Sequence, residues 1–137
     1  MGATAPFEVD LGRTSDTPSQ ARKLLTDRFG AELTGAEMDT AKLLTSELVT
    51  NAVVHGQGRI GVRGHLDQNR LLVEVIDEGS GFERLADQRE FRGFGGWGLN
   101  LVDAESSRWG IHEGTTHVWF ELERQGPRLG LDAKPDT

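Results

Sequence analysis

The segments with strand-like patterns come in adjacent pairs, and this pairing constrains the fold more than any other feature of the sequence. The four segments cover about 59–66, 70–77, 106–112 and 115–123. Short polar turns, Asp67-Gln68-Asn69 and Glu113-Gly114, separate the two members of each pair, as in antiparallel hairpins. Parallel neighbours would need a helical crossover between them. The sequence therefore predicts an α+β fold with a mixed, mostly antiparallel sheet.

An opening strand and two helices precede the first hairpin. The strand is expected over 7–11, the first helix over 18–29, and the second helix from Thr34 to about His55. Thr34 and Glu37 have the spacing of a capping box, which marks a helix start. Helices that share one face of a sheet give a two-layer α/β sandwich.

Composition supports a single domain and disfavours several kinds of partner. The chain has 137 residues, with 22 acidic residues against 15 Lys and Arg and a net charge of −7. The basic residues are scattered and outnumbered by acidic ones, which disfavours binding to the phosphates of nucleic acid, and no run approaches the roughly 20 apolar residues that span a bilayer. Cysteine is absent, which fits the cytoplasm. We expect one domain over 7–123, with flexible tails at 1–6 and 124–137.

Polar side chains form a row along the second predicted helix. Glu47, Asn51 and His55 are spaced four residues apart, and each such step turns the side chain by only about 40°. The same stripe holds Leu43, Leu44 and Leu48, which predicts that it faces the interior. Buried polar groups need partners. These partners could be neighbouring backbone groups or a bound ligand.

A carboxylate ends the strand predicted over 70–77. Asp77 continues the apolar face of Val73 and Val75, because alternate residues share a face. A carboxylate there can accept a hydrogen bond from an exocyclic amine. Gly79 and Gly81 allow the backbone to turn and approach a ligand closely. An ordinary exit from strand to loop would look the same.

A glycine-rich stretch, Gly93-Phe94-Gly95-Gly96-Trp97-Gly98-Leu99, leads into a helix-like run expected over 98–104. Glycine-rich backbone before a helix start can hold phosphates, or it can be a flexible loop. The stretch also fits a dinucleotide-binding fingerprint, but that motif needs a strand directly before it. The residues before it are instead highly charged, and we expect 78–96 to be a long lid-like loop.

Taken together, the three motifs resemble those of the GHKL ATPase superfamily, over about residues 7–123. The helix motif is similar to its N box, Asp77-Glu78-Gly79-Ser80-Gly81 to its D-x-G-x-G box, and the stretch from Gly93 to its later glycine box. Within the superfamily, residues 47–56 are especially similar to bacterial anti-sigma factor serine kinases. The resemblance implies a Bergerat-type ATP-binding fold with ATP and Mg²⁺ as ligands.

The resemblance also implies roles for individual residues. Glu47 would be the general base, Asn51 would hold Mg²⁺, and Asp77 would bind the adenine amino group. The further nucleotide-binding positions would be Gly79, Gly81, Gly93, Gly95, Gly96, Gly98, Leu99 and Thr116, with Thr115 as the alternative threonine. His55 would lie near the site without a catalytic role.

The implied activity is that of an ATP-dependent serine/threonine protein kinase. By resemblance it would phosphorylate an anti-sigma factor antagonist, bind a sigma factor and form a homodimer. Two alternatives are a non-catalytic switch that binds a protein partner only with ATP, and a nucleotide-binding subunit of a larger signalling system. Histidine-kinase activity is disfavoured, because the helix over 18–29 carries no histidine.

Two histidines flank the second hairpin turn. A zinc site built on His112 and His117 is conceivable, but the sequence indicates no third ligand for it. Hairpin surface positions are the interpretation that the sequence favours.

Overall fold

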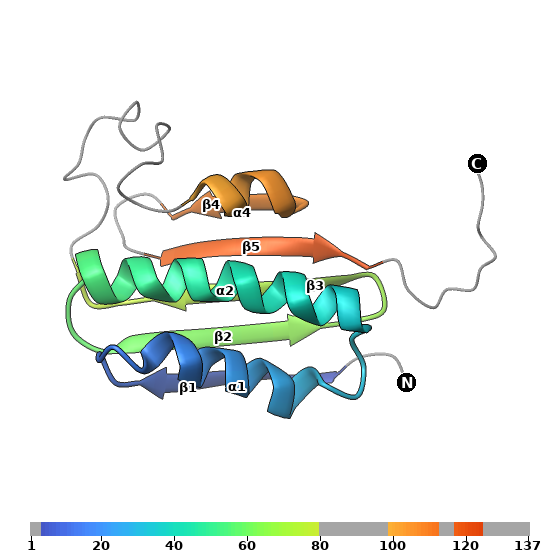
Figure 1. Cartoon of the computed structure of the whole chain (residues 1–137), viewed down its shortest axis with the longest axis horizontal. Helices are drawn as coiled ribbons and strands as arrows, with labels where there is room; N and C mark the ends of the chain where they lie inside the picture. Colours follow the sequence, from blue (N-terminus) through green and yellow to red (C-terminus); the bar gives the residue numbers. More distant parts are fainter. Residues whose placement is uncertain (1–3, 80–98, 113–116, 125–137) are drawn as a thin grey trace.

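The described part of the chain is a two-layer α/β sandwich with its helices on one face of a sheet (Figure 1). A computed structural model describes residues 4–79, 99–112 and 117–124. The elements in chain order are β1 Thr4–Leu11, α1 Thr17–Phe29, α2 Gly35–His55, β2 Ile60–Leu66, β3 Arg70–Ile76, α4 Asn100–Glu105, β4 Arg108–Ile111 and β5 His117–Glu123. The predicted elements are all present among these residues, although β1 begins earlier and β4 is shorter than expected.

Over the described residues, the sheet has five strands in the order β1-β2-β3-β5-β4. Each neighbouring pair of these strands is antiparallel, so the predicted hairpins are confirmed. The chain leaves β3 and returns through α4 to the edge, where it forms β4. The second hairpin then places β5 beside β3. This path makes β3 the middle strand.

The apolar core lies between the sheet and the helices. Alternate residues of the strands face inward, as the period of two requires. The inward side chains of β3 and β5 include Leu71, Val73, Val75, Val118 and Phe120, and all five are buried. They pack under α2, which supplies Leu44, Leu48 and Val49. Among the described residues, no helix is long and apolar enough to cross a membrane.

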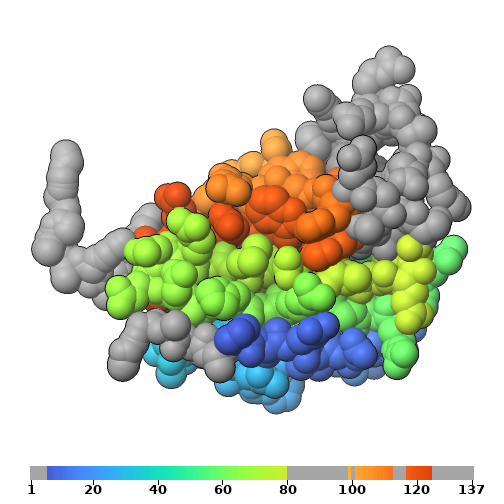
Figure 2. All heavy atoms as spheres, turned by 180° about the vertical axis from the view of Figure 1, so that it is seen from behind, coloured from blue at the N-terminus to red at the C-terminus, as the bar shows by residue number. Residues whose placement is uncertain are grey.

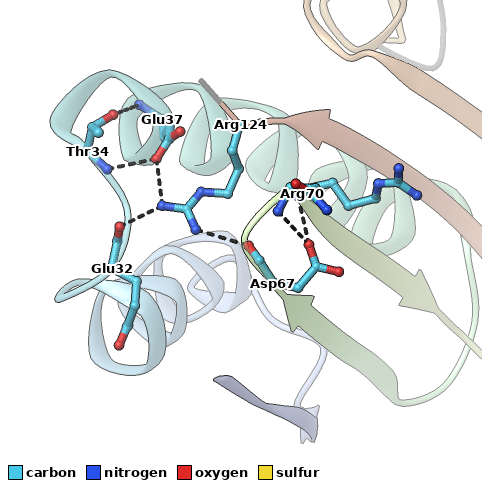
Figure 3. A network of polar contacts seen from close by, with 7 residues as sticks. Glu32, Thr34, Glu37, Asp67, Arg70 and Arg124 are labelled. Carbon is cyan, nitrogen blue, oxygen red and sulfur yellow. Dashed lines mark hydrogen bonds and ion pairs between the residues drawn. The ribbon is translucent and has the colours of Figure 1, made fainter. Parts of the chain in front are cut away.

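Arg124 ties three segments together at the start of α2 (Figure 3). Its guanidinium donates to the carbonyl oxygens of Asp67 at 3.0 Å and Glu32 at 2.8 Å, and it lies 3.4 Å from the Glu37 carboxylate. Glu37 also completes the predicted capping box with Thr34. The β2–β3 turn and the loop before α2 are therefore held at a common point. This contact fixes one end of the helix that carries Glu47 and Asn51.

Candidate functional site

The end of β3 meets the end of α2 where Asp77 packs against Gly56. A Cβ placed on Gly56 would overlap the Asp77 carboxylate and would lie 2.7 Å from the carbonyl oxygen of Ala52. The φ of Gly56 is −90°, which any residue can adopt, so the close approach is what requires glycine. The Oδ1 atom of Asp77 accepts a hydrogen bond from the Gly79 N–H at 2.7 Å. The carboxylate is thus oriented from two sides and remains partly exposed.

The loop after α2 is bonded to the residues that follow β3. The Glu78 N–H donates to the Gln57 carbonyl at 2.8 Å, and the Glu78 carboxylate accepts from the Arg59 N–H at 3.1 Å. Gly58 has a φ of +70° and approaches Glu78 closely, a backbone conformation that favours glycine. The surroundings of Asp77 therefore form one hydrogen-bonded unit from two distant stretches of chain.

Arg13 holds the C-terminal end of α2. Its guanidinium donates to the Val53 carbonyl at 2.6 Å and to the Ala52 carbonyl at 3.3 Å, and it also bonds the Gly56 carbonyl. The last carbonyls of a helix have no partner within it, and a cation at this end is favoured by the helix dipole. Arg13 therefore fixes the backbone against which Asp77 packs. The sequence carries no signal for this contact, because Arg13 is 40 positions from Val53.

The two polar residues expected to act on the phosphates lie on α2 before this junction. Asn51 is buried, with 9% of its surface exposed, and Glu47 is half-buried. Burial raises the pKa of the Glu47 carboxyl above its ordinary value, because desolvation disfavours the charged form. A carboxylate with a raised pKa holds a proton more strongly, which suits a general base.

The expected inward orientation of the whole stripe is wrong at two positions. Leu44 and Leu48 are buried as predicted, but Leu43 is 43% exposed and His55 is also exposed. A stripe of residues four apart drifts by about 40° at each step. It therefore starts on the solvent side at Leu43 and reaches the covered side only near Asn51, and His55 lies at the helix end.

The groups are arranged in a row along the helix. At about 1.5 Å per residue, Asn51 lies roughly 7.5 Å along the axis from Gly56, where Asp77 packs, and Glu47 lies about 6 Å further back. Going back along α2 from its C-terminal end, the polar groups are therefore the Asp77 carboxylate, the buried Asn51 amide and the partly desolvated Glu47 carboxylate.

The remaining predicted site residues divide into two groups. Leu99 is fully buried immediately before α4, so its side chain belongs to the core and only its backbone could serve a ligand. The other positions lie outside the described residues: Gly81, Gly93, Gly95, Gly96, Gly98, Thr115 and Thr116. Most of the expected lid, 78–96, also lies outside them.

The residues that are described fit a nucleotide and a magnesium ion. Asp77 offers acceptor atoms at a partly exposed position where a glycine permits close approach. The Asn51 amide and the Glu47 carboxylate offer oxygen atoms, the ligands that Mg²⁺ prefers.

The described fold is an antiparallel sheet layered with helices. Its longest helix carries this polar row and ends against an acidic residue. This is the architecture of a histidine kinase-like ATP-binding domain. Residues 13–122 match the family model of the histidine kinase-like ATPase domain, and the chain belongs to this family. The family is one of ATP-binding domains.

One solved structure shows the same fold. The chain is similar to the crystal structure of the RsbU and RsbW domains of Rv1364c from Mycobacterium tuberculosis, with a TM-score of 0.65 and 23% identity. The match covers 89% of this chain and 32% of that chain, so this chain spans about a third of its length. No curated protein matches the chain.

Proposed function

We propose that this chain is an ATP-dependent serine/threonine kinase that acts as an anti-sigma factor. The observation that carries the proposal is the row on and beside α2, which runs from Asp77 through Asn51 to Glu47. This order corresponds to the order of the parts of ATP that the three residues would serve, from the base through the phosphates to the transferred group.

Asp77 recognises the adenine base in this proposal. Its carboxylate accepts hydrogen bonds and donates none when ionised, so it suits the exocyclic amine of adenine. The N–H of Gly79 and the backbone at Gly56 hold the carboxylate in one orientation. A fixed acceptor selects adenine over a base that presents a carbonyl there, since two acceptors cannot bond.

Asn51 holds Mg²⁺ through its side-chain oxygen. When bound, Mg²⁺ neutralises charge on the phosphates. The burial of Asn51 restricts its side chain, and the packing of α2 on the sheet sets its distance from Asp77. A variant in which Asn51 is replaced by a residue without a side-chain oxygen would therefore lose Mg²⁺.

Glu47 acts as the general base. It accepts the hydroxyl proton of the incoming serine or threonine while that oxygen bonds to the γ-phosphorus and the bond to ADP breaks. The raised pKa of Glu47 makes it a stronger proton acceptor than an exposed carboxylate.

The regulatory part of the proposal has two supports. Residues 47–56 resemble the N box of anti-sigma factor serine kinases, and the solved structure with the same fold includes an RsbW domain. On this basis the substrate is an anti-sigma factor antagonist, the second partner is a sigma factor, and the setting is the cytoplasm. We also propose that the chain acts as a homodimer.

A second candidate is an ATP-dependent switch without phosphoryl transfer. One observation favours it: Glu78, next to the proposed base-binding residue, is hydrogen-bonded to the exposed loop at Gln57 and Arg59. Binding at Asp77 could therefore change a protein-binding surface directly.

Incubation with labelled ATP, Mg²⁺ and candidate antagonist proteins separates the two functions. The kinase proposal predicts label on a serine or threonine of the antagonist with the wild type, and label that appears at least about 100-fold more slowly with Glu47→Gln. ATP-dependent binding of a partner without any transfer of label supports the switch instead.

A further inference from the structure

The sheet face turned away from the helices carries a cluster of three potential metal ligands (Figure 2 views this side). Val75 and Val118 point into the core, so their neighbours Glu74 and His117 point to the opposite face. His112 follows β4 directly, and its N–H donates to the His117 carbonyl at 2.9 Å. The three residues therefore come from β3, β5 and the end of β4.

The three side chains lie close enough to share one ion. Nε2 of His117 is 3.3 Å from Oε2 of Glu74. The rings of His112 and His117 are stacked, with centroids 4.0 Å apart and planes 18° apart. One candidate ligand atom from each residue lies within 4.8 Å of the others. Two ligands of a tetrahedral zinc ion with bonds of about 2.0–2.1 Å are themselves about 3.3–3.4 Å apart.

We propose that Glu74, His112 and His117 form a binding site for Zn²⁺ or a similar late first-row divalent ion. Two imidazole nitrogens and one carboxylate oxygen suit this class of ion, whereas Mg²⁺ and Ca²⁺ prefer sites built from oxygen alone. A solvent water completes the four-coordinate shell, as in zinc sites with three protein ligands. The structure thus supplies, from β3, the third ligand that the sequence did not indicate.

The neighbours of the cluster orient its ligands. Nη1 of Arg63 lies 3.4 Å from Oε1 of Glu74 and leaves Oε2 directed at His117. Such outer partners fix the position of a ligating carboxylate. The positive charge of Arg63 is offset by Glu8, whose carboxylate lies 3.4 Å from Arg63 Nε. The Glu74 carboxylate is therefore oriented toward His117, and the positive charge of Arg63 beside it is balanced by Glu8.

Two of the three candidate ligands are partly withdrawn from solvent. The Glu74 and His117 side chains are only 19% and 15% exposed.

A metal at this position would link the middle strand to the second hairpin. His112 and His117 belong to the hairpin and Glu74 to β3, so binding would hold three strands together. An ion that binds only the folded chain raises its stability by mass action. This effect is independent of the nucleotide, whose proposed site lies on the helical face.

Calorimetric titration of the EDTA-treated full chain with Zn²⁺ tests the site. The wild type should bind one equivalent, with a rise in Tm and with no saturable binding of Ca²⁺. His112→Asn, His117→Asn and Glu74→Gln should each weaken Zn²⁺ binding by more than about 100-fold, since loss of an outer partner alone costs 10- to 100-fold. Co²⁺ should give a visible absorption band that is lost in the same variants.

Two matched variants complete the design. His65→Asn removes an exposed histidine of β2 on the same face, and Asn51→Ala removes the proposed Mg²⁺ ligand; both should bind Zn²⁺ as the wild type does. His112 is exposed, so we expect His112→Asn to stay folded. If another variant unfolds, the Zn²⁺ affinity of His112→Asn still tests the site. Unchanged Zn²⁺ affinity in His112→Asn, equal losses in His65→Asn, or no saturable binding by the wild type would overturn the proposal.

Discussion

The Asp77 carboxylate packs directly on the backbone of Gly56, so that the end of β3 and the end of α2 fix each other's position. No side chain fits between them. The residue proposed to read the adenine base and the helix proposed to bind the phosphates therefore share one contact. This relationship makes the chemistry of the site sensitive to a residue that carries no functional group.

Gly56→Ala should damage both the site and the fold. The added methyl group overlaps Asp77 and the Ala52 carbonyl, and overpacking of this kind costs typically about 1–3 kcal/mol. We expect a lower Tm and at least about a tenfold loss of ATP affinity, equivalent to about 1.4 kcal/mol. Gly35→Ala is the control, because a Cβ there meets nothing within 4 Å. Normal ATP binding by Gly56→Ala would remove the junction from the nucleotide site.

Asp77→Asn should abolish ATP binding while the chain stays folded. The amide can present a donor toward the adenine amine, where the carboxylate presents only acceptors. Its remaining oxygen can still accept the bond from Gly79. Calorimetry with ATP and a circular dichroism melt measure the two properties, with the exposed Asp10→Asn as the control. A folded variant with wild-type affinity would exclude Asp77 from base recognition.

Arg13 and Arg124 hold opposite ends of α2 and should differ in their effects. Each guanidinium bonds backbone carbonyls that would lose a partner in a methionine variant, at a cost of about 1–3 kcal/mol. Both Arg13→Met and Arg124→Met should lower the free energy of unfolding. Only Arg13→Met should also weaken ATP binding, because Arg13 bonds the helix end at Gly56. Denaturant melts and ATP titration of the pair test this contrast, and equal ATP affinities would contradict it.

The titration of Glu47 should link stability to pH. Its pKa is raised above the ordinary 4.5 in the folded chain, so the folded state binds the proton more tightly than the unfolded state. The charged carboxylate then lowers stability above the folded pKa, and this penalty disappears as the pH falls below about 4.5. Glu47→Gln should therefore have a higher Tm than the wild type at pH 7 and an equal one at pH 4. A lower Tm for the variant at pH 7 would contradict the burial argument.

Local signals predicted most of the fold. The capping box of Thr34 and Glu37 and the polar turn at residues 67–69 act within a few residues, so they can be read directly from the sequence. The position of Asp77 on the inner face followed from the period of two. In contrast, the order of β4 and β5 depends on the pairing of β5 with β3, which lies far away in the sequence, and no local rule predicts such a pairing.

The missed features are contacts between distant positions. Arg13 bonds a carbonyl 40 positions away, Arg124 one that is 92 positions away, and Glu74 meets His117 across 43 positions. None of these pairs leaves a pattern in a single sequence. The exposure of His55 was missed for another reason, since helical periodicity describes the direction of a side chain and not whether the partner layer extends that far.

Asn51 is proposed to bind Mg-ATP and Glu47 to catalyse phosphoryl transfer, and paired measurements on two variants separate these roles. Mg-ATP affinity and the initial rate of phosphorylation of an antagonist are measured for wild type, Glu47→Ala and Asn51→Ala. A general base contributes about 10²- to 10⁴-fold to the rate, and its removal affects the transition state more than binding. We expect Glu47→Ala to bind Mg-ATP normally but to transfer phosphate about 10²- to 10⁴-fold more slowly, and Asn51→Ala to lose both properties. Equal phosphorylation rates for the wild type and Glu47→Ala would contradict the proposed role of Glu47.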